Sequence, residues 1–337
     1  MKLLLTSALL CALGFTSLSQ VYFGGAYVDG LPFPTDKNLK KRIQEEKIKT
    51  KKSFSYKYKS DKPEENFKDM SETMYNSRGE MVEHTIYSKK HEKKWSYVYK
   101  YDSEGHMTEY ARINAKGRTV QRITYAFNAA GKQTEQVVYR RGGEKIRSRN
   151  VNHYNELGKI ADATYYGRGG KLASKSIYEY YADGSLKSSS FYKGNGKLLH
   201  TWTYDCKPEG QLADMKSKDS SMICTHTEFD KDGNKITISE EKRADKKVVK
   251  TISKTNKKDK VIEFTMLNTD GDISFRYAFS YDNNDNITET SLFLKGNKMV
   301  YKIEYMYDEH GNVTEAHHYS KKGEPVTLTK YSYEKYN

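Results

Sequence analysis

A repeat of about 26 residues runs along almost the whole chain of 337 residues. Each copy holds an aromatic residue, then Asp or Asn, and then a tight turn, as in Tyr101-Asp102 to Gly105. Self-similarity at a fixed period is typical of proteins in which one supersecondary unit is stacked on the next. We therefore expect the function to lie on a repeated surface, and we expect no enzyme. The copies begin at Tyr75-Asn76, Tyr101-Asp102, Phe127-Asn128, Tyr154-Asn155, Tyr204-Asp205, Phe229-Asp230, Tyr281-Asp282 and Tyr307-Asp308.

Two turns alternate along each repeat. The first turn follows the aromatic–Asp pair, and the second lies about 12 to 14 residues further on, as at Gly117 and Gly143. The segments between them, such as Thr119 to Tyr125, are short and rich in Tyr, Thr, Val and Ile, which is typical of β-strands. The pattern predicts an all-β fold: an elongated array of antiparallel β-hairpin repeats with about twenty strands, as an open twisted meander or a partial wrap. Closure of the array into a shell stays open at this point.

The first 19 residues have the order of a secretory signal peptide. Lys2 precedes an apolar stretch from Leu3 to Phe15, and Ser17-Leu18-Ser19 supplies small residues before Gln20. We expect cleavage after residue 19 and an exported protein, in the periplasm, at the cell surface or outside the cell. No later segment is apolar and long enough for a transmembrane helix.

Residues 20–62 differ from the repeats. The segment begins with Gly- and Pro-rich irregular chain, and Asp36 to about Lys52 is expected to form a short basic helix with Leu39, Ile43 and Ile48 as its apolar residues. Its expected role is to cap the first exposed strand of the array. Residues 63–337 are expected to form the repeat domain.

The cysteines leave two interpretations open. After signal cleavage only Cys206 and Cys224 remain, and they flank the one irregular repeat. They are either a disulfide or two free thiols. The sequence has no Cys/His set with metal-site spacing and no catalytic motif, so we expect no metal and no cofactor.

Two columns of side chains recur around the first turns. Aromatic residues before the turn and apolar residues two positions after it are expected to share one face, as core or, alternatively, as a sugar-stacking stripe. A column of acids follows four residues after the turn, with rungs roughly 10 Å apart, which is too wide for paired acid/base catalysis. Cross-strand pairing with Lys and Arg is the expected role of these acids: Glu83, Glu109, Glu135, Asp162, Asp214, Glu263, Glu289 and Glu315.

The first and second turns differ in charge, and the second turns hold most of the Lys and Arg residues. The chain has a formal net charge of +14, and the first turns are mostly neutral or acidic. In a meander, alternate turns emerge at opposite edges, so one long edge is expected to be basic and to suit an anionic polymer. The alternative is that these lysines keep the array soluble and monomeric. The candidate anionic-ligand residues are Lys89, Lys90, Lys116, Arg118, Arg140, Arg141, Arg168, Lys171, Lys193, Lys197, Lys295, Lys298, Lys321 and Lys322.

The motif Tyr-x-Tyr-Asp-x-x-Gly resembles the YD repeats of Rhs-type proteins. It occurs as Tyr99 to Gly105 and as Tyr305 to Gly311, and Tyr180 to Lys187 looks like the hairpins of MORN-like repeat proteins. The resemblance covers about residues 70 to 335. Rhs-type proteins wrap their strands around a carboxy-terminal toxin, whereas we expect no toxin domain here. The MORN-like resemblance implies binding to lipids, envelope polymers or a partner protein.

The expected function is therefore that of a secreted, non-enzymatic binding or scaffold module at the cell envelope. Its expected partner is an anionic envelope polymer or surface, and export disfavours nucleic acid. The alternative is an immunity-type protein that neutralises a toxin by binding it. A glycan-active enzyme is a third, weaker hypothesis.

Overall fold

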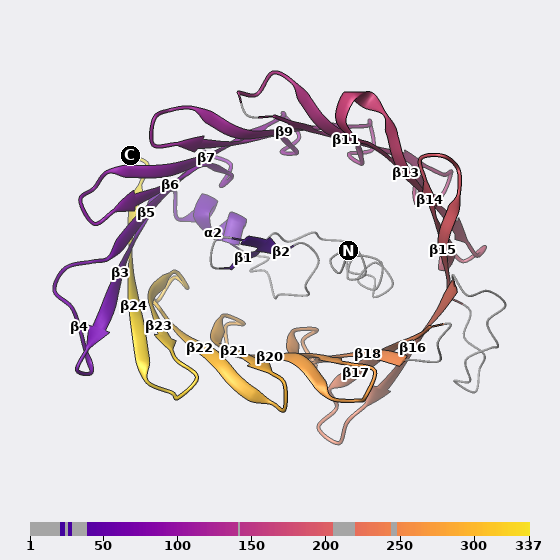
Figure 1. Cartoon of the computed structure of the whole chain (residues 1–337). Coiled ribbons are helices and arrows are strands. Elements are labelled where there is room, and N and C mark those ends of the chain that lie inside the picture. Colours follow the sequence, from indigo (N-terminus) through magenta and orange to yellow (C-terminus); the bar gives the residue numbers. More distant parts are fainter. Residues whose placement is uncertain (1–20, 24–25, 29–38, 141, 205–219, 244–247) are drawn as a thin grey trace.

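The computed structural model describes residues 21–23, 26–28, 39–140, 142–204, 220–243 and 248–337. Within this part of the chain, the strands β3 to β24 form one closed barrel, and β1 and β2 form a separate two-stranded sheet. Figure 1 shows the barrel as a wide ring, with the helix α2 inside it. The prediction of an all-β array of antiparallel hairpins with one short N-terminal helix is confirmed.

The strands are short and follow the two-turn pattern of the sequence. The first part consists of β1 (Val21–Phe23), β2 (Ala26–Val28), α2 (Leu39–Glu45), β3 (Ile48–Lys59), β4 (Lys62–Pro63), β5 (Asp69–Tyr75), β6 (Met81–Ser88), β7 (Lys93–Tyr101), β8 (Met107–Asn114), β9 (Thr119–Phe127), β10 (Gln133–Tyr139), β11 (Ile146–Tyr154) and β12 (Ile160–Tyr166). The second part consists of the 3₁₀ turn η1 (Arg168–Gly170), β13 (Leu172–Tyr180), β14 (Leu186–Lys193), β15 (Leu198–Thr203), β16 (Ser220–Phe229), β17 (Lys235–Arg243), β18 (Val248–Thr255), β19 (Val261–Leu267), β20 (Ile273–Tyr281), β21 (Ile287–Leu294), β22 (Lys298–Tyr307), β23 (Val313–Tyr319) and β24 (Pro325–Lys335).

In most of the described first turns, the Asp or Asn of the repeat caps the turn with its side chain. Asn128 Oδ1 accepts hydrogen bonds from the amides of Ala130, at 3.1 Å, and Lys132, at 3.0 Å. The amide of Gly131 donates to the Asn128 carbonyl, at 2.9 Å, and Gly131 has φ +70°. A side-chain acceptor at the first position and a left-handed residue at the fourth explain why Asx and Gly recur at this spacing. Asp285 holds the same left-handed position, with φ +66°.

The barrel closes through β3, which corrects two predictions. The array is not an open meander, because β24 pairs antiparallel with β3 from Thr327↔Lys57 to Lys335↔Ile48, and β3 also pairs with β5. The predicted helix from Asp36 to about Lys52 is wrong in its second half, because α2 ends at Glu45 and Ile48 begins β3. Edge strands with unpaired backbone groups are costly, and pairing the two ends of the sheet removes them.

One junction departs from the meander. The strands β15 and β16 pair in parallel through Thr201↔Ser220, Trp202↔Ser221 and Thr203↔Met222, whereas the other neighbouring strands pair antiparallel. A parallel pair needs a connection that returns to the opposite rim. Residues 205–219, which include the first part of the irregular repeat, lie outside the described residues.

The helix α2 lies against the inner wall at the first-turn rim. Ile43 and Ile48, each 1% exposed, pack with Tyr75, and Met81 and Tyr333 pack against this cluster. The cluster therefore joins the helix to strands from both sides of the closure. The expected cap over an exposed strand is replaced by a helix inside a closed ring.

An ion pair between an exposed lysine and a buried glutamate ties α2 to the first turn that it meets. Lys40 Nζ lies 2.9 Å from Glu80 Oε1, and Asn76 and Arg78 also donate hydrogen bonds to the Glu80 carboxylate. Burial alone would raise the pKa of Glu80, but the hydrogen bonds from Asn76 and Lys40 and the charges of Lys40 and Arg78 bring it below its ordinary value. At Gly79, a Cβ would lie 2.4 Å from the Lys40 carbonyl oxygen, so only glycine allows this approach.

The substitution Glu80→Gln is expected to lower the free energy of unfolding by about 1–2 kcal/mol at neutral pH. The folded-state pKa of Glu80 is depressed, so its contribution is present above the unfolded pKa and is lost as pH falls through the folded value. Urea unfolding at neutral and at acidic pH measures the difference. The control is Glu104→Gln in the next first turn, whose carboxylate is exposed. An equal loss for Glu80→Gln at both pH values would contradict the ionic role.

Candidate functional site

The inner and outer faces of the wall carry different side chains. Because α2 lies inside the ring and packs on Tyr75 and Tyr333, these tyrosines face the interior. The repeat places Tyr101 at the same position, and strand alternation adds Tyr97 and Tyr99 to the inner face. Tyr97 and Tyr110 are buried in a cluster with Ile123, as the core interpretation of the aromatic stripe predicts.

In six strands, a tyrosine at or near the end of the strand links one repeat to the previous one. Its hydroxyl donates to a carbonyl oxygen 20 or 21 residues earlier in the chain, at 2.6 to 2.8 Å. This bond explains why tyrosine is used where phenylalanine would pack equally well. The residues that form this tyrosine ladder are Tyr101, Tyr154, Tyr180, Tyr281, Tyr307 and Tyr333.

On the outer wall, Arg and Lys side chains form ion pairs with the acid column. Arg122 Nη2 lies 2.6 Å from Glu109 Oε2, and the Arg122 guanidinium lies 4.7 Å from the centre of the Tyr139 ring. The same arrangement joins Arg276 to Glu263, at 3.0 Å, and to Phe293, at 4.0 Å. Burial opposes ionisation of Glu109, but the hydrogen bonds and charges of Lys100 and Arg122 lower its pKa.

The predicted cross-strand pairing of the acid column is confirmed for most members. Cations lie within 4 Å of Glu83, Glu109, Glu135, Asp162, Glu263 and Glu315. Glu289 instead accepts a hydrogen bond from Ser291, at 2.8 Å. Asp214 lies outside the described residues.

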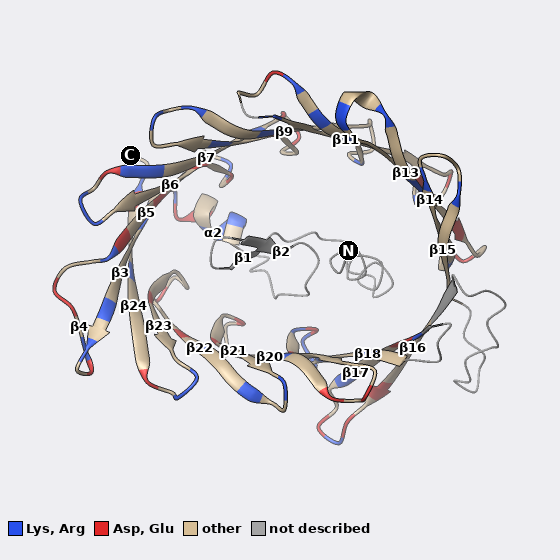
Figure 2. Ribbon diagram, viewed as in Figure 1, with Lys and Arg blue, Asp and Glu red and all other residues tan. Residues whose placement is uncertain are grey.

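Strand pairing places the second turns of the described residues at one rim, as expected for the basic edge. In contrast to the outer wall, the described candidate cations at this rim have no carboxylate within ion-pairing distance among the described residues. All are exposed except Arg140, which is half-buried, and Arg141 lies outside the described residues. Figure 2 shows basic segments along these turns.

The rim is not uniformly basic. We call the part over β6 to β15 the basic arc: Lys89, Lys90, Lys116, Arg118, Arg140, Arg168, Lys171, Lys193 and Lys197. The described residues of the same turns hold two acids, Glu92 and Glu144. On the opposite side of the ring, the turn between β19 and β20 holds Asp270 and Asp272 instead. The candidate cations over β6 to β15 therefore form one continuous arc. The other candidates, Lys295, Lys298, Lys321 and Lys322, lie outside this arc.

Sequence reasoning did not separate the two sets of aromatic residues. The aromatic residues before the second turns, such as Tyr139 and Tyr166, lie on the outer wall with Arg122 and Arg149. By contrast, the first-turn residue Tyr75 faces the interior, where it packs on α2. Arg122 lies directly opposite Tyr139 and diagonally across from Glu109, and this relation was the signal that could have assigned this face.

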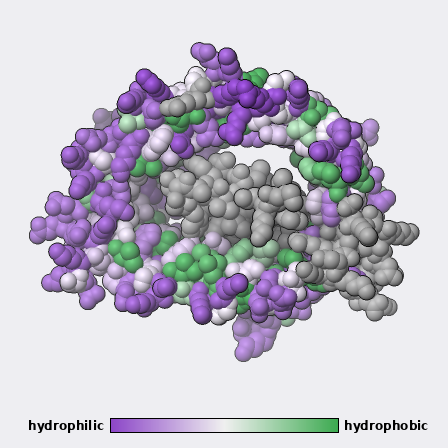
Figure 3. Space-filling model, viewed as in Figure 1, coloured by the Kyte–Doolittle hydropathy of each residue, from purple (hydrophilic) through white to green (hydrophobic). Residues whose placement is uncertain are grey.

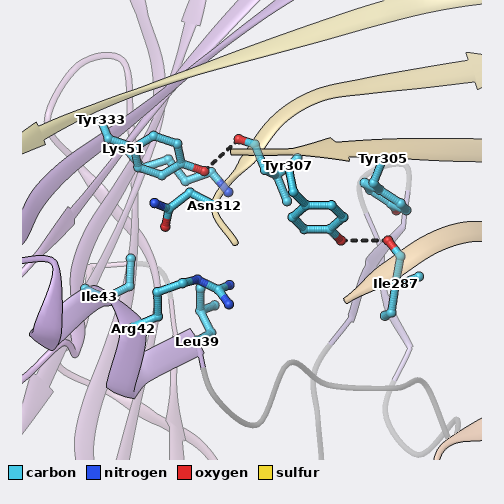
Figure 4. Close-up of a pocket in the computed structure, with 10 residues that line it drawn as sticks. Leu39, Arg42, Ile43, Lys51, Ile287, Tyr305, Tyr307, Asn312 and Tyr333 are labelled. Atoms are coloured by element: carbon cyan, nitrogen blue, oxygen red, sulfur yellow. Dashed lines mark hydrogen bonds between the residues drawn. The ribbon is translucent and has the colours of Figure 1, made fainter. Parts of the chain in front are cut away.

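A small pocket of about 250 Å³ lies between α2 and the inner wall (Figure 4). Leu39, Arg42 and Ile43 form its helix side, and Tyr307 and Tyr333 form part of the wall. The two tyrosines belong to the tyrosine ladder, with hydroxyl bonds to the carbonyls of Ile287 and Val313. Because the same residues dock the helix, we interpret this pocket as a packing gap.

Among residues 39–140, 142–204, 220–243 and 248–337, no group of His, Cys, Asp and Glu is arranged to hold a metal ion. None of the described helices has the length and apolar character needed to cross a membrane. Cys224 is disulfide-bonded, and both other cysteines, Cys11 and Cys206, lie outside the described residues. The predicted signal peptide also lies outside them.

Comparisons with known proteins identify no family. Neither a protein-family model nor a curated protein matches the chain. A porin-like protein from Bacteroides uniformis is similar over 86% of this chain and 97% of its own, with 8% identity and a TM-score of 0.31. A porin-like protein from Bacteroides vulgatus has 10% identity and a TM-score of 0.24, over 85% of this chain and 98% of its own. The Tc holotoxin pore of Photorhabdus luminescens has 11% identity and a TM-score of 0.23, over 77% of this chain but 19% of its own. Likenesses with TM-scores this low do not identify a family.

Proposed function

We propose that this protein is an exported, non-enzymatic binding module that attaches to an anionic polymer or surface of the cell envelope through the basic arc. The observation that carries the proposal is the contrast in charge compensation. Cations on the outer wall are paired with the acid column, whereas those of the basic arc have no carboxylate partner among the described residues.

The geometry suits a multivalent ligand. Successive turns of one rim are two strands apart, which is roughly 10 Å, so five turns present charges along an extended line. Exposed cations without internal partners keep their full attraction for an external anion, and this attraction falls with ionic strength. A ligand that spans several turns gains affinity from each turn that it reaches.

Neutralising the basic arc is expected to weaken polyanion binding by about a hundredfold or more at low salt, since each exposed cation near a polyanion contributes about 1 kcal/mol. The test variant carries Lys116→Gln, Arg118→Gln, Lys193→Gln and Lys197→Gln. Binding of the mature protein to dextran sulfate and to isolated envelope fractions is measured across a salt series. Wild-type affinity should fall with salt, and the variant should show a shallower dependence.

The matched control removes four exposed lysines at or near the first-turn rim, Lys159, Lys187, Lys231 and Lys257. It has the same net charge as the test variant, and its affinity should stay within about threefold of wild type at low salt, where the position of each charge matters most. Equal weakening by both variants would show that only net charge matters. Absence of binding by the wild type would refute the proposal and favour a specific protein partner.

A further inference from the structure

The outer wall directly beneath the basic arc holds exposed aliphatic side chains. Ile146, Leu172 and Leu198 each follow a second turn of the arc, and they are 48%, 44% and 44% exposed. They pair across their hairpins with Tyr139, Tyr166 and Tyr192, which are half-buried. We call these six residues the apolar band. Figure 3 shows apolar residues among hydrophilic ones over this side of the ring.

Register and charge pairing place the apolar band on the outer face. Residues directly opposite each other in a hairpin share a face of the sheet. Tyr139 and Tyr166 lie over the guanidinium groups of Arg122 and Arg149, whose partners are the acids of the outer wall. Tyr192 is the register partner of Lys175, which pairs with Asp162 on the same face.

The basic arc and the apolar band lie next to each other along the chain. Lys171 immediately precedes Leu172, and Lys197 immediately precedes Leu198. The three hairpins are neighbours in the sheet, so the band spans roughly 20 Å along the rim. The chain thus presents a row of uncompensated cations with aliphatic and tyrosine side chains just behind them.

We infer that the basic arc and the apolar band together dock this protein onto a lipid bilayer with anionic headgroups; the inference rests on the proposed function and names its ligand. Lysines and arginines next to a membrane attract acidic headgroups. Tyrosines favour the interface between headgroups and acyl chains, and exposed aliphatic side chains gain from leaving water there. An anionic polysaccharide would engage the arc but would offer no apolar layer for Ile146, Leu172 and Leu198.

The test measures sedimentation of the mature protein with vesicles. One set contains phosphatidylcholine alone, and the other contains equal parts of phosphatidylcholine and phosphatidylglycerol. The variant Ile146→Ser, Leu172→Ser, Leu198→Ser is expected to bind the acidic vesicles about tenfold or more weakly than wild type, because it loses most of the apolar transfer. Its binding to dextran sulfate should be unchanged, since the arc is intact.

The control removes three exposed apolar residues near the first-turn rim, through Leu157→Ser, Phe229→Ser and Met306→Ser. These side chains are 59%, 70% and 54% exposed, and the control should bind acidic vesicles as wild type does. Far-ultraviolet circular dichroism and thermal melts of all proteins check that they fold.

The outcomes distinguish bilayer docking from the more general proposal that the basic arc binds an anionic polymer or surface. Selective loss of vesicle binding in the band variant supports docking to a bilayer. Equal vesicle binding by wild type and band variant, or equal weakening by the control, overturns it. Wild-type binding to dextran sulfate without binding to acidic vesicles overturns the bilayer and leaves the proposed function standing. Failure to bind either anion refutes both.

Discussion

Replacing Ile48 by alanine is expected to lower the free energy of unfolding by about 2–5 kcal/mol and to loosen the seam of the barrel. Ile48 is 1% exposed, begins β3, and packs with Ile43 of α2 and with Tyr75. Its removal leaves a cavity where helix, β3 and β5 meet, and β3 is the strand that joins the two ends of the sheet. Urea unfolding measures the change in stability.

Hydrogen exchange identifies where the seam loosens. The amides of β3 and β24 should exchange faster in Ile48→Ala than in wild type, whereas those of β8 and β9 should change little. Leu39→Ala is the control, because Leu39 belongs to the same helix but is 39% exposed. It should cost less than about 1 kcal/mol. Uniform acceleration of exchange around the ring would contradict a local role for Ile48.

The barrel is expected to lose stability steeply as pH rises above about 10. Burial raises the pKa of Tyr75 to about 12, and burial together with the charge of Tyr305 raises the pKa of Tyr331 to about 12. A raised folded-state pKa means that the folded chain holds these protons while the unfolded chain releases them, so stability falls as pH rises between the two values. Each of these two buried groups accounts for roughly 2–3 kcal/mol over that window.

An alkaline titration with two readouts tests this expectation. The absorbance of tyrosinate should rise in two stages, first for exposed tyrosines and then together with the loss of the circular dichroism signal. The substitutions Tyr75→Phe and Tyr331→Phe should each flatten the decline of stability between about pH 10 and 12. Tyr165→Phe is the control, because Tyr165 is 44% exposed. A single titration near the ordinary tyrosine pKa with the fold intact would contradict the expectation.

Local chemistry made the turns and the rims predictable. The side chain of Asn128 caps its turn and Gly131 takes its left-handed position, so this short motif marks a hairpin turn wherever it recurs in the chain. Alternating turns of a meander must emerge at opposite edges, which is why Lys116 and Lys193 could be assigned to one rim from the sequence. The prediction that the acid column pairs with Lys and Arg across strands rested on the same local pattern, and Glu109 pairs with Arg122 in this way.

The closure of the sheet into a barrel could not be predicted from local sequence patterns in this way. The segment from Ile48 to Lys59 lies outside the repeats, and the sequence interpretation assigned its first part, to about Lys52, to a short basic helix. The alternation of Phe54, Tyr56 and Tyr58 with other residues was the strand signal that this interpretation missed. β3 pairs with the nearby β5 on one side, but its partner on the other side, β24, comes nearly 280 residues later.

The sequence by itself determined the hairpins, their turns, the side-chain columns and the separation of charge between two rims. These features depend on contacts within one hairpin or between adjacent hairpins, which a 26-residue period encodes directly. Only the tertiary structure decided that the sheet closes, that α2 lies inside it, and that Ile146, Leu172 and Leu198 stand exposed beneath the basic arc. These features depend on the accumulated twist of many strands and on contacts between distant parts of the chain, which no local pattern contains.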